Sequence, residues 1–92
     1  MLVEIKPSTR EGKKYTAVFS NPKKTVHFGS KGMDDYTLTH DKEQRERYRK
    51  RHAKDLETND PRRAGFLSYY ILWGNSTSIQ TNIRDFKSRF NV

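Results

Sequence analysis

One stretch of this 92-residue chain, residues 60–74, sets the strongest limit on what the chain can fold into. It holds the single Trp and the densest apolar run, from Phe66 to Trp73. Asp60 and Pro61 are typical of a helix start, and Gly74 is typical of the left-handed residue that ends a helix. Because large side chains would cover nearly every direction around this helix, we expect it to be buried at the centre of the fold.

This predicted helix does not have the length of a membrane span. It has about 13 residues, whereas crossing a bilayer takes roughly 20. The chain contains no Cys, which excludes disulfides and thiolate metal sites. Residues 1–4 also lack the basic start of a signal peptide. We therefore expect a protein without a membrane span, made and assembled inside a cell.

The first third of the chain has the alternation of short strands. Strands are predicted at Leu2–Lys6, Lys14–Ser20 and Thr25–Gly29, because apolar and polar residues alternate there and turn-forming residues separate them. Short connections of this kind favour an antiparallel three-stranded meander. Tyr36–Leu38 is predicted to be one further short extended segment.

Two more helices are predicted on either side of the central one. Asp41 and Gln44 resemble a capping box that opens a helix over residues 41–56, whose narrow apolar stripe is Tyr48, His52 and Leu56. Thr77 and Gln80 open the last helix in the same way.

A regular helical stripe follows in that last helix: Ile79, Ile83, Phe86 and Phe90. The prediction is one α+β domain over residues 1–92, with a β-rich part at 1–33 and a helical part at 41–92. The helical part has three helices, the second of them buried.

The charge of the chain indicates the kind of partner. The net charge is +8, and only 32% of the residues are hydrophobic, so the core is small. The first 33 residues carry seven Lys or Arg against two Glu, and the last 32 carry five against one Asp. Such a chain attracts polyanions or the acidic surfaces of other proteins.

The candidate binding residues are basic side chains from both ends of the chain and from the first helix. They could contact phosphates, or they could form a solvated helix face and protect sheet edges from aggregation. These candidates for nucleic-acid or acidic-partner binding are Lys13, Lys14, Lys23, Lys24, Arg47, Arg49, Lys50, Arg51, Lys54, Arg62, Arg63, Arg84 and Lys87.

The central helix contributes two further hypotheses. Arg62 and Arg63 are predicted in its first turn, where cations oppose the helix dipole. They are either retained for an anionic partner or paired locally with Asp60. Tyr69, Tyr70 and Trp73 form a possible interface, because a small fold has little surface with which to cover all of the central helix.

Catalytic patterns are absent from the sequence. Gly29-Ser30-Lys31-Gly32 lacks the spacing of a Walker loop and is interpreted as a structural turn. His27, His40 and His52 match no metal signature, and no nucleophile–base arrangement is indicated. We expect a non-enzymatic protein with no cofactor and no metal.

Many dispersed residues resemble a family of small basic proteins of large nucleocytoplasmic DNA viruses, over about residues 24–90. The residues that carry the resemblance are Val26-His27-Phe28-Gly29, Gly32, Asp35-Tyr36-Thr37, Asp41, Arg45, Tyr48, Arg51-His52, Asp60-Pro61, Ala64-Gly65-Phe66, Ser68, Ile71-Leu72-Trp73, and Phe86-Lys87 with Arg89-Phe90. The resemblance implies a viral source and a place in the virion, and it carries over no functional residue.

Two functions follow from these expectations. The first is a virion structural protein whose basic surface binds DNA backbone without sequence preference. The alternative is a minor capsid or cement protein that contacts acidic surfaces of other capsid subunits. In either case we expect the protein in the host cell interior during assembly, then in the virion as part of a larger assembly.

Overall fold

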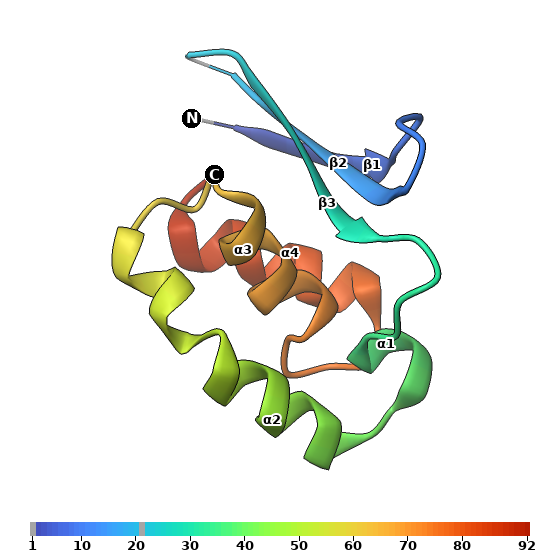
Figure 1. Ribbon diagram of the computed structural model, residues 1–92. Coiled ribbons are helices and arrows are strands. Elements are labelled where there is room, and N and C mark those ends of the chain that lie inside the picture. Colours follow the sequence, from blue (N-terminus) through green and yellow to red (C-terminus); the bar gives the residue numbers. More distant parts are fainter. Residues whose placement is uncertain (1, 21) are drawn as a thin grey trace.

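The computed structural model describes residues 2–20 and 22–92 and has an α+β fold, with a three-stranded antiparallel sheet followed by helices (Figure 1). The strands are β1 (Val3–Pro7), β2 (Lys13–Phe19) and β3 (Lys24–Ser30), in the spatial order β1-β2-β3. This confirms the predicted meander. Residue 21, in the predicted turn between β2 and β3, lies outside the described residues.

The register of the sheet collects apolar residues on one face. Val3 lies opposite Phe19, and Ala17 lies between Ile5 and Val26. Because side chains alternate along a strand, these residues share the face that is turned toward the helices. Ala17 and Phe19 are fully buried there, so β2 supplies the centre of the sheet's contribution to the core.

The helical part contains more segments than the three helices predicted. The described segments are α1 (Tyr36–Thr39), α2 (Lys42–Arg51), the 3-10 helix η1 (Ala53–Thr58), α3 (Ala64–Leu67), the π-helical turn η2 (Ser68–Leu72) and α4 (Ile79–Phe90). The first predicted helix corresponds to α2 with η1, the second to α3 with η2, and the third to α4.

Helix α1 replaces the extended segment predicted at Tyr36–Leu38, and that prediction is wrong. The Asp35 side chain accepts a hydrogen bond from the backbone N–H of Thr37, which caps the helix and turns the chain locally. His40 ends the helix in the left-handed conformation.

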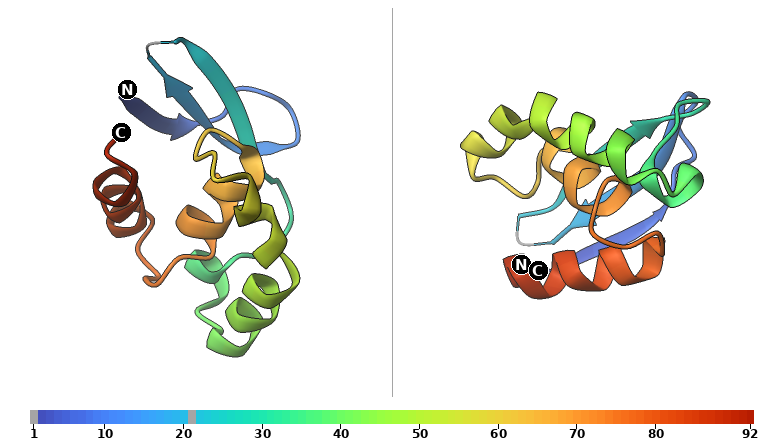
Figure 2. Two further views of the ribbon diagram at one scale, coloured as in Figure 1. Left: turned by 90° about the vertical axis from the view of Figure 1, so that its left-hand side faces the viewer. Right: turned by 90° about the horizontal axis from the view of Figure 1, so that it is seen from below.

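The segment formed by α3 and η2 lies at the centre of the molecule. It packs against β3 on one side and lies between α2 and α4 (Figure 2). Phe66, Leu67, Ile71 and Leu72 are buried, so the prediction of a buried second helix is confirmed. Most of its length is a π turn rather than α-helix, in which the N–H of Trp73 bonds to the carbonyl of Ser68.

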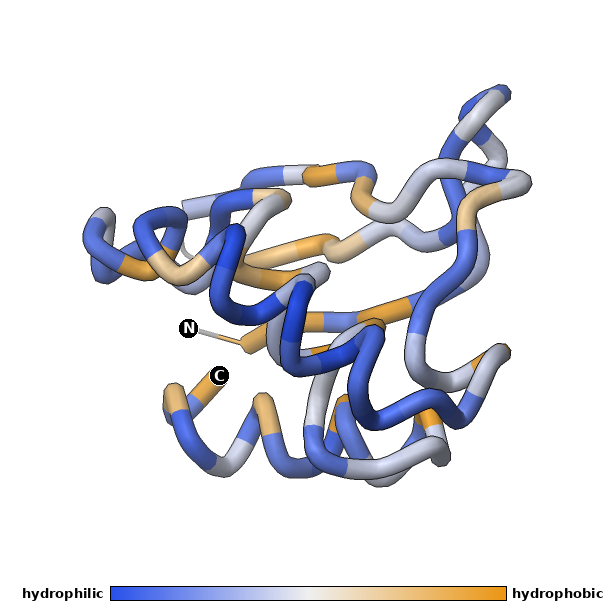
Figure 3. The backbone as a smooth tube through the Cα atoms, turned by 60° about the horizontal axis from the view of Figure 1, so that its bottom comes forward, coloured by the Kyte–Doolittle hydropathy of each residue, from blue (hydrophilic) through white to orange (hydrophobic). Residues whose placement is uncertain are grey.

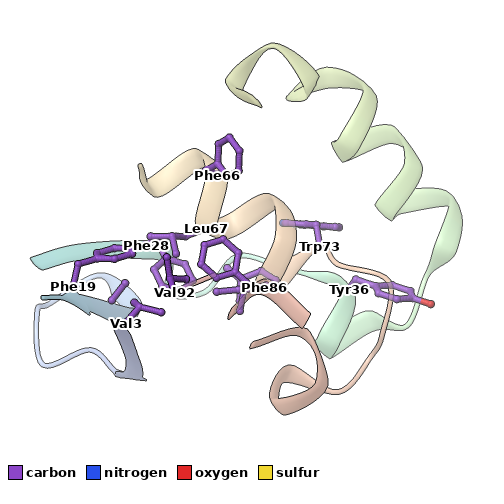
Figure 4. Packing of buried hydrophobic residues seen from close by; sticks show 12 residues of the cluster. Val3, Phe19, Phe28, Tyr36, Phe66, Leu67, Trp73, Phe86 and Val92 are labelled. Atoms are coloured by element: carbon purple, nitrogen blue, oxygen red, sulfur yellow. The ribbon is translucent and has the colours of Figure 1, made fainter. Parts of the chain in front are cut away.

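Residues from every layer meet in one hydrophobic cluster (Figure 4). Phe19 and Phe28 enter it from the sheet, Leu67 from the central segment and Phe86 from α4. The predicted stripe of α4 packs against this cluster, since Ile79, Ile83 and Phe90 are partly buried around Phe86. Tyr48 of α2 is also partly buried against the cluster. The core therefore joins the sheet to α2, to the central segment and to α4.

The predicted start of the central helix is wrong by several residues. Helix α3 begins at Ala64 with Arg63 as its N-cap, and Asp60 instead accepts the backbone N–H of Arg62 in the preceding turn. Arg62 and Arg63 therefore precede the helix rather than occupying its first turn. Arg63 at the N-cap is still close to the positive end of the helix, and its pairing with the Asp60 carboxylate offsets that charge.

Gly74 is needed for its lack of a side chain and not for a left-handed conformation. It is not among the glycines with positive φ in the described residues. A Cβ atom there would lie 2.3 Å from the carbonyl oxygen of Tyr70 and 2.9 Å from the Asn82 side chain. The predicted left-handed cap is thus wrong, and close packing is the physical reason for glycine.

The caps of α2 and α4 agree only in part with the prediction. Asp41 caps α2, but the Gln44 side chain bonds to Thr39 and does not complete a capping box. Helix α4 is capped by Ser78, one residue after the predicted Thr77.

Within the described residues, no helix has both the length and the apolar character needed to cross a membrane.

Replacing Trp73 with Ala should lower the free energy of unfolding by about 3–5 kcal/mol, as for other large buried aromatics. Trp73 is 7% exposed and stacks on Tyr48 with 4.3 Å between ring centroids. Urea unfolding would measure the loss, with Leu38→Ala as a control because Leu38 is 65% exposed. A loss below about 1 kcal/mol for Trp73→Ala would contradict its place in the core.

Gly74→Ala should also destabilise the fold, by about 1–3 kcal/mol, because the new methyl group meets backbone that has to shift. Gly65→Ala is the matched control. Its Cβ would meet only the Asp55 side chain, at 3.2–3.3 Å, and alanine favours the helix. Equal thermal unfolding midpoints for the two variants would show that the region of Gly74 has room to relax.

Candidate functional site

The basic side chains of α2 separate onto two sides of the helix. Arg47 and Arg51 are four residues apart and lie on the side toward the sheet, where they border a groove. Arg45 and Arg49 have the same spacing and face the loop at Asn75. The helix is hydrophilic along its length (Figure 3). Its arginines are therefore divided between two surfaces.

The groove lies between α2 and the end of the sheet and has a volume of about 690 Å³. Lys13 of β2 and Ser30 of β3 line its sheet side, and Arg47 and Arg51 line its α2 side. The central segment closes the base of the groove with residues that include Trp73. Elements from both halves of the chain thus build one concave surface.

The groove carries a small surplus of positive charge. Lys13, Arg47 and Arg51 contribute positive charge, while Asp34 and Asp55 contribute negative charge. The carboxylate of Asp55 lies 3.0 Å from Nδ1 of His52. Arg47 and Arg51 are exposed, so their guanidinium groups are accessible to a ligand in solution.

Lys14 has a structural role instead of the binding role predicted for it. Its Nζ lies 2.6 Å from Oδ2 of Asp35 and donates to the carbonyl of Met33. The Lys14 and Asp35 side chains are only 14% and 2% exposed. The charge of Lys14 is therefore neutralised inside the protein, although the residue borders the groove.

Three stacked rings connect the groove to the core. The ring centroid of Tyr48 lies 4.2 Å from that of His52 and 4.3 Å from that of Trp73, with nearly parallel planes in the second pair. His52 was predicted to be buried in the stripe of its helix, but its side chain is 36% exposed. Trp73 is buried at the base of the groove, and its part in an interface stays a prediction.

Burial raises the pKa of the Tyr48 hydroxyl to about 12, with a smaller contribution from the Asp55 carboxylate. The charge of Arg51 and a hydrogen bond with Ser68 act in the opposite direction. Tyr48 is therefore neutral and sandwiched between two rings, and it serves as a support for α2 rather than as an acid or a base.

Arg62 and Arg63 are paired locally. The Nε atoms of Arg62 and Arg63 lie 3.1 Å and 3.9 Å from the Asp60 carboxylate. The backbone N–H of Arg62 holds the pKa of Asp60 below its ordinary value, and the charges of Arg62 and Lys24 act in the same direction. Local pairing of these arginines with Asp60, one of the two predicted alternatives, is therefore present. Lys24 is close enough to Asp60 for its charge to act on the same carboxylate.

The other predicted basic residues are spread over the surface. Lys23 borders a shallow apolar hollow beside β1. Lys50 and Lys54 are exposed, and they line neither the groove nor the side of α2 that faces the loop at Asn75. Arg84 is 76% exposed and Lys87 is half-buried on α4. The structure thus brings Lys13, Arg47 and Arg51 together and leaves these five apart from them.

A second surface brings the predicted candidates Arg49, Tyr69 and Tyr70 together with Arg89, which was not among the predicted site residues. Arg89 lies over the ring of Tyr70, and Arg49 lies over the ring of Tyr69. Both tyrosines are half-buried rather than open. Arg89 follows the apolar Phe86 by three residues, which places both on one side of α4, and this spacing is the signal that could have identified it.

The described residues contain no group of three His, Cys, Asp or Glu side chains that could hold a metal ion. Nδ1 of His27 lies 3.0 Å from Oγ of Ser8 and 2.9 Å from Oγ1 of Thr16. These three residues do not line the groove. The arrangement at the groove itself is suited to holding anions by charge and by hydrogen bonds from guanidinium groups.

Comparison with known proteins places this chain in a family. The model of DUF5754, a family of unknown function, matches residues 3–52, and the chain belongs to this family. The matched segment contains the sheet, α1 and α2, and therefore both long sides of the groove. No curated protein and no solved structure matches the chain significantly.

The ionisation of Tyr48 should make part of the stability depend on alkaline pH. Its pKa is 10.0 in the unfolded chain and about 12 in the fold, so the folded protein holds the proton more tightly. The resulting stability is fully present below pH 10 and is lost as pH rises toward 12. The difference in unfolding free energy between wild type and Tyr48→Phe should decrease over this interval. A tyrosinate absorbance titration that gives Tyr48 a pKa near 10.0 would contradict this prediction.

Proposed function

We propose that the groove binds the phosphate backbone of nucleic acid, without preference for base sequence. The observation that carries this proposal is the convergence of Lys13 with Arg47 and Arg51 on one concave surface. Lys13 is more than thirty positions from the two arginines in the sequence, and only the fold brings it close to them. A row of cations across a groove neutralises successive phosphates and releases their counterions.

The side chains in the groove favour contact with the backbone over the reading of bases. Arg47 and Arg51 border the groove, while Tyr48 between them in the sequence packs on the core and holds the helix in place. Base readout needs a helix or strand that can enter the major groove of DNA with its side chains free. Lys50 of α2 and Lys54 of η1, which are both exposed, can add further charge along a strand of phosphates.

The biological setting is also part of the proposal. The resemblance to small basic proteins of large nucleocytoplasmic DNA viruses supports a non-enzymatic virion structural protein, with the genome as its partner. The positive charge of the chain supports the same assignment, since a protein that packages DNA has to neutralise it. Locating the protein in purified particles, with the genome or in the shell, tests this setting directly.

The alternative is a minor capsid or cement protein in the same kind of particle. It is favoured by the basic residues that binding in the groove leaves unused, namely Arg49, Arg84, Lys87 and Arg89 on the side of α4. Such residues can meet acidic patches on other capsid subunits. A location in the shell lattice would support this alternative over the first proposal.

Charge reversal in the groove should weaken DNA binding and its dependence on salt. The slope of log affinity against log salt concentration changes by about one for each phosphate contact removed. Arg47→Glu combined with Arg51→Glu should therefore reduce the slope for a random duplex by about two. Fluorescence anisotropy over a series of salt concentrations would measure both affinity and slope.

The matched control is Arg84→Glu combined with Lys87→Glu, which reverses the same amount of charge on α4. If the groove is the binding site, this control should retain the wild-type slope to within about one contact. Equal losses in the two double variants would assign binding to net charge alone. No measurable binding of wild type to duplex at low salt would exclude the proposed function.

A further inference from the structure

A second cavity lies on the other side of α2 from the groove. Its volume is about 380 Å³, and it is bordered by Arg49 of α2, by the loop at Gly74 and Asn75, and by Asp85 and Arg89 of α4. Tyr69 and Tyr70 also line it. We call this cavity the Arg49–Arg89 pocket. Its lining residues differ from those of the groove.

Both arginines of the pocket are held by aromatic rings. Cζ of Arg49 lies 4.8 Å from the ring centroid of Tyr69, and Cζ of Arg89 lies 5.1 Å from that of Tyr70. The two tyrosine rings contact each other edge to face at 5.1 Å. Stacking covers a face of the guanidinium plane and leaves the donors that lie in the plane available.

Arg49 has donor capacity that the described residues do not fully use. Its Nη1 donates to Oδ1 of Asn75 at 3.2 Å. Its Nε is buried and, within residues 2–20 and 22–92, has no hydrogen-bond acceptor. A buried donor without an acceptor is unfavourable, so a small shift of Arg49 toward an incoming anion would be favoured.

The charge of the pocket fits a single carboxylate. The charged residues in its lining are two arginines and Asp85, which leaves a surplus of one positive charge. The pocket is also smaller than the groove, about 380 Å³ against about 690 Å³, which suits a single planar group better than a run of phosphates. A planar carboxylate also matches the fork of N–H donors that a stacked guanidinium presents.

We propose that the Arg49–Arg89 pocket binds a carboxylate of an acidic segment of a partner protein. The site and its ligand are separate from the groove and from nucleic acid, so this proposal holds or fails independently of DNA binding, and it gives the alternative function one specific contact. Asp85 competes with the incoming carboxylate and limits affinity. Arg89 supplies the accessible donors, because it is the more exposed of the two arginines.

The test uses the full chain labelled with ¹⁵N and follows the Nε–Hε signals of its arginines. The probe is a blocked hexaglutamate peptide, and blocked hexaglutamine is its neutral control. Saturable shifts at Arg49 and Arg89 with the acidic peptide alone are expected. Absence of such shifts, or equal shifts with both peptides, would overturn the proposal.

Three variants give the test its specificity. Arg89→Gln should weaken the peptide about tenfold, as expected for the loss of one charge-assisted contact. Lys87→Gln, which removes one positive charge from the same helix outside the pocket, should have little effect. Asp85→Asn should tighten binding severalfold, because it removes the competing carboxylate.

A weakening by Lys87→Gln as large as that by Arg89→Gln would show that only net charge matters, and the proposal would be wrong. Arg89→Lys is a second variant that keeps the charge and removes the planar fork, and it should also weaken the peptide. A titration with random duplex completes the test. Shifts at Arg49 and Arg89 as large as those with hexaglutamate would overturn the assignment to carboxylate.

Discussion

The ion pair between Lys14 and Asp35 joins the sheet to the helical part of this protein. Asp35 is 2% exposed, and it accepts from Lys14 on one oxygen and from Thr37 on the other. A buried carboxylate is tolerable only with such partners, so the cation of β2 and the start of α1 depend on each other. The chain then continues from α1 to the N-cap of α2 at Asp41, which fixes where α2 begins relative to the sheet.

The position of the groove follows from the Lys14–Asp35 ion pair. Lys13 precedes Lys14 and Asp34 precedes Asp35, so the residues next to the ion pair line the groove. The opposite side is α2, which the stack of Tyr48 on Trp73 holds against the core. The Lys14–Asp35 ion pair thus fixes the sheet side of the groove, and the stack of Tyr48 on Trp73 fixes the α2 side. This arrangement allows a helix of very low hydrophobicity to pack on the core while Arg47 and Arg51 stay exposed at the groove.

Local patterns predicted the strands, the buried central segment and the apolar stripe of α4, because each depends on residues that are close in the sequence. Helix α1 was missed because it depends on Asp35, whose burial is made possible by Lys14, 21 positions earlier. The role of Gly74 was misjudged for a similar reason, since Asn82 of α4 limits the space around it. The basic residues were identified as a set, but their division between a groove, a corner at Asp60 and a pocket at α4 depends on tertiary contacts.

The stack of His52, Tyr48 and Trp73 has an optical consequence. Trp73 is the only Trp of the chain, and its ring is in direct contact with Tyr48, whose other face meets a half-exposed His52 in the groove. Indole emission is sensitive to neighbouring rings and charges. A ligand that binds in the groove near His52 therefore affects Trp73 emission through the two ring contacts of Tyr48. The unlabelled protein therefore carries its own reporter for events at the groove, and no second Trp obscures its signal.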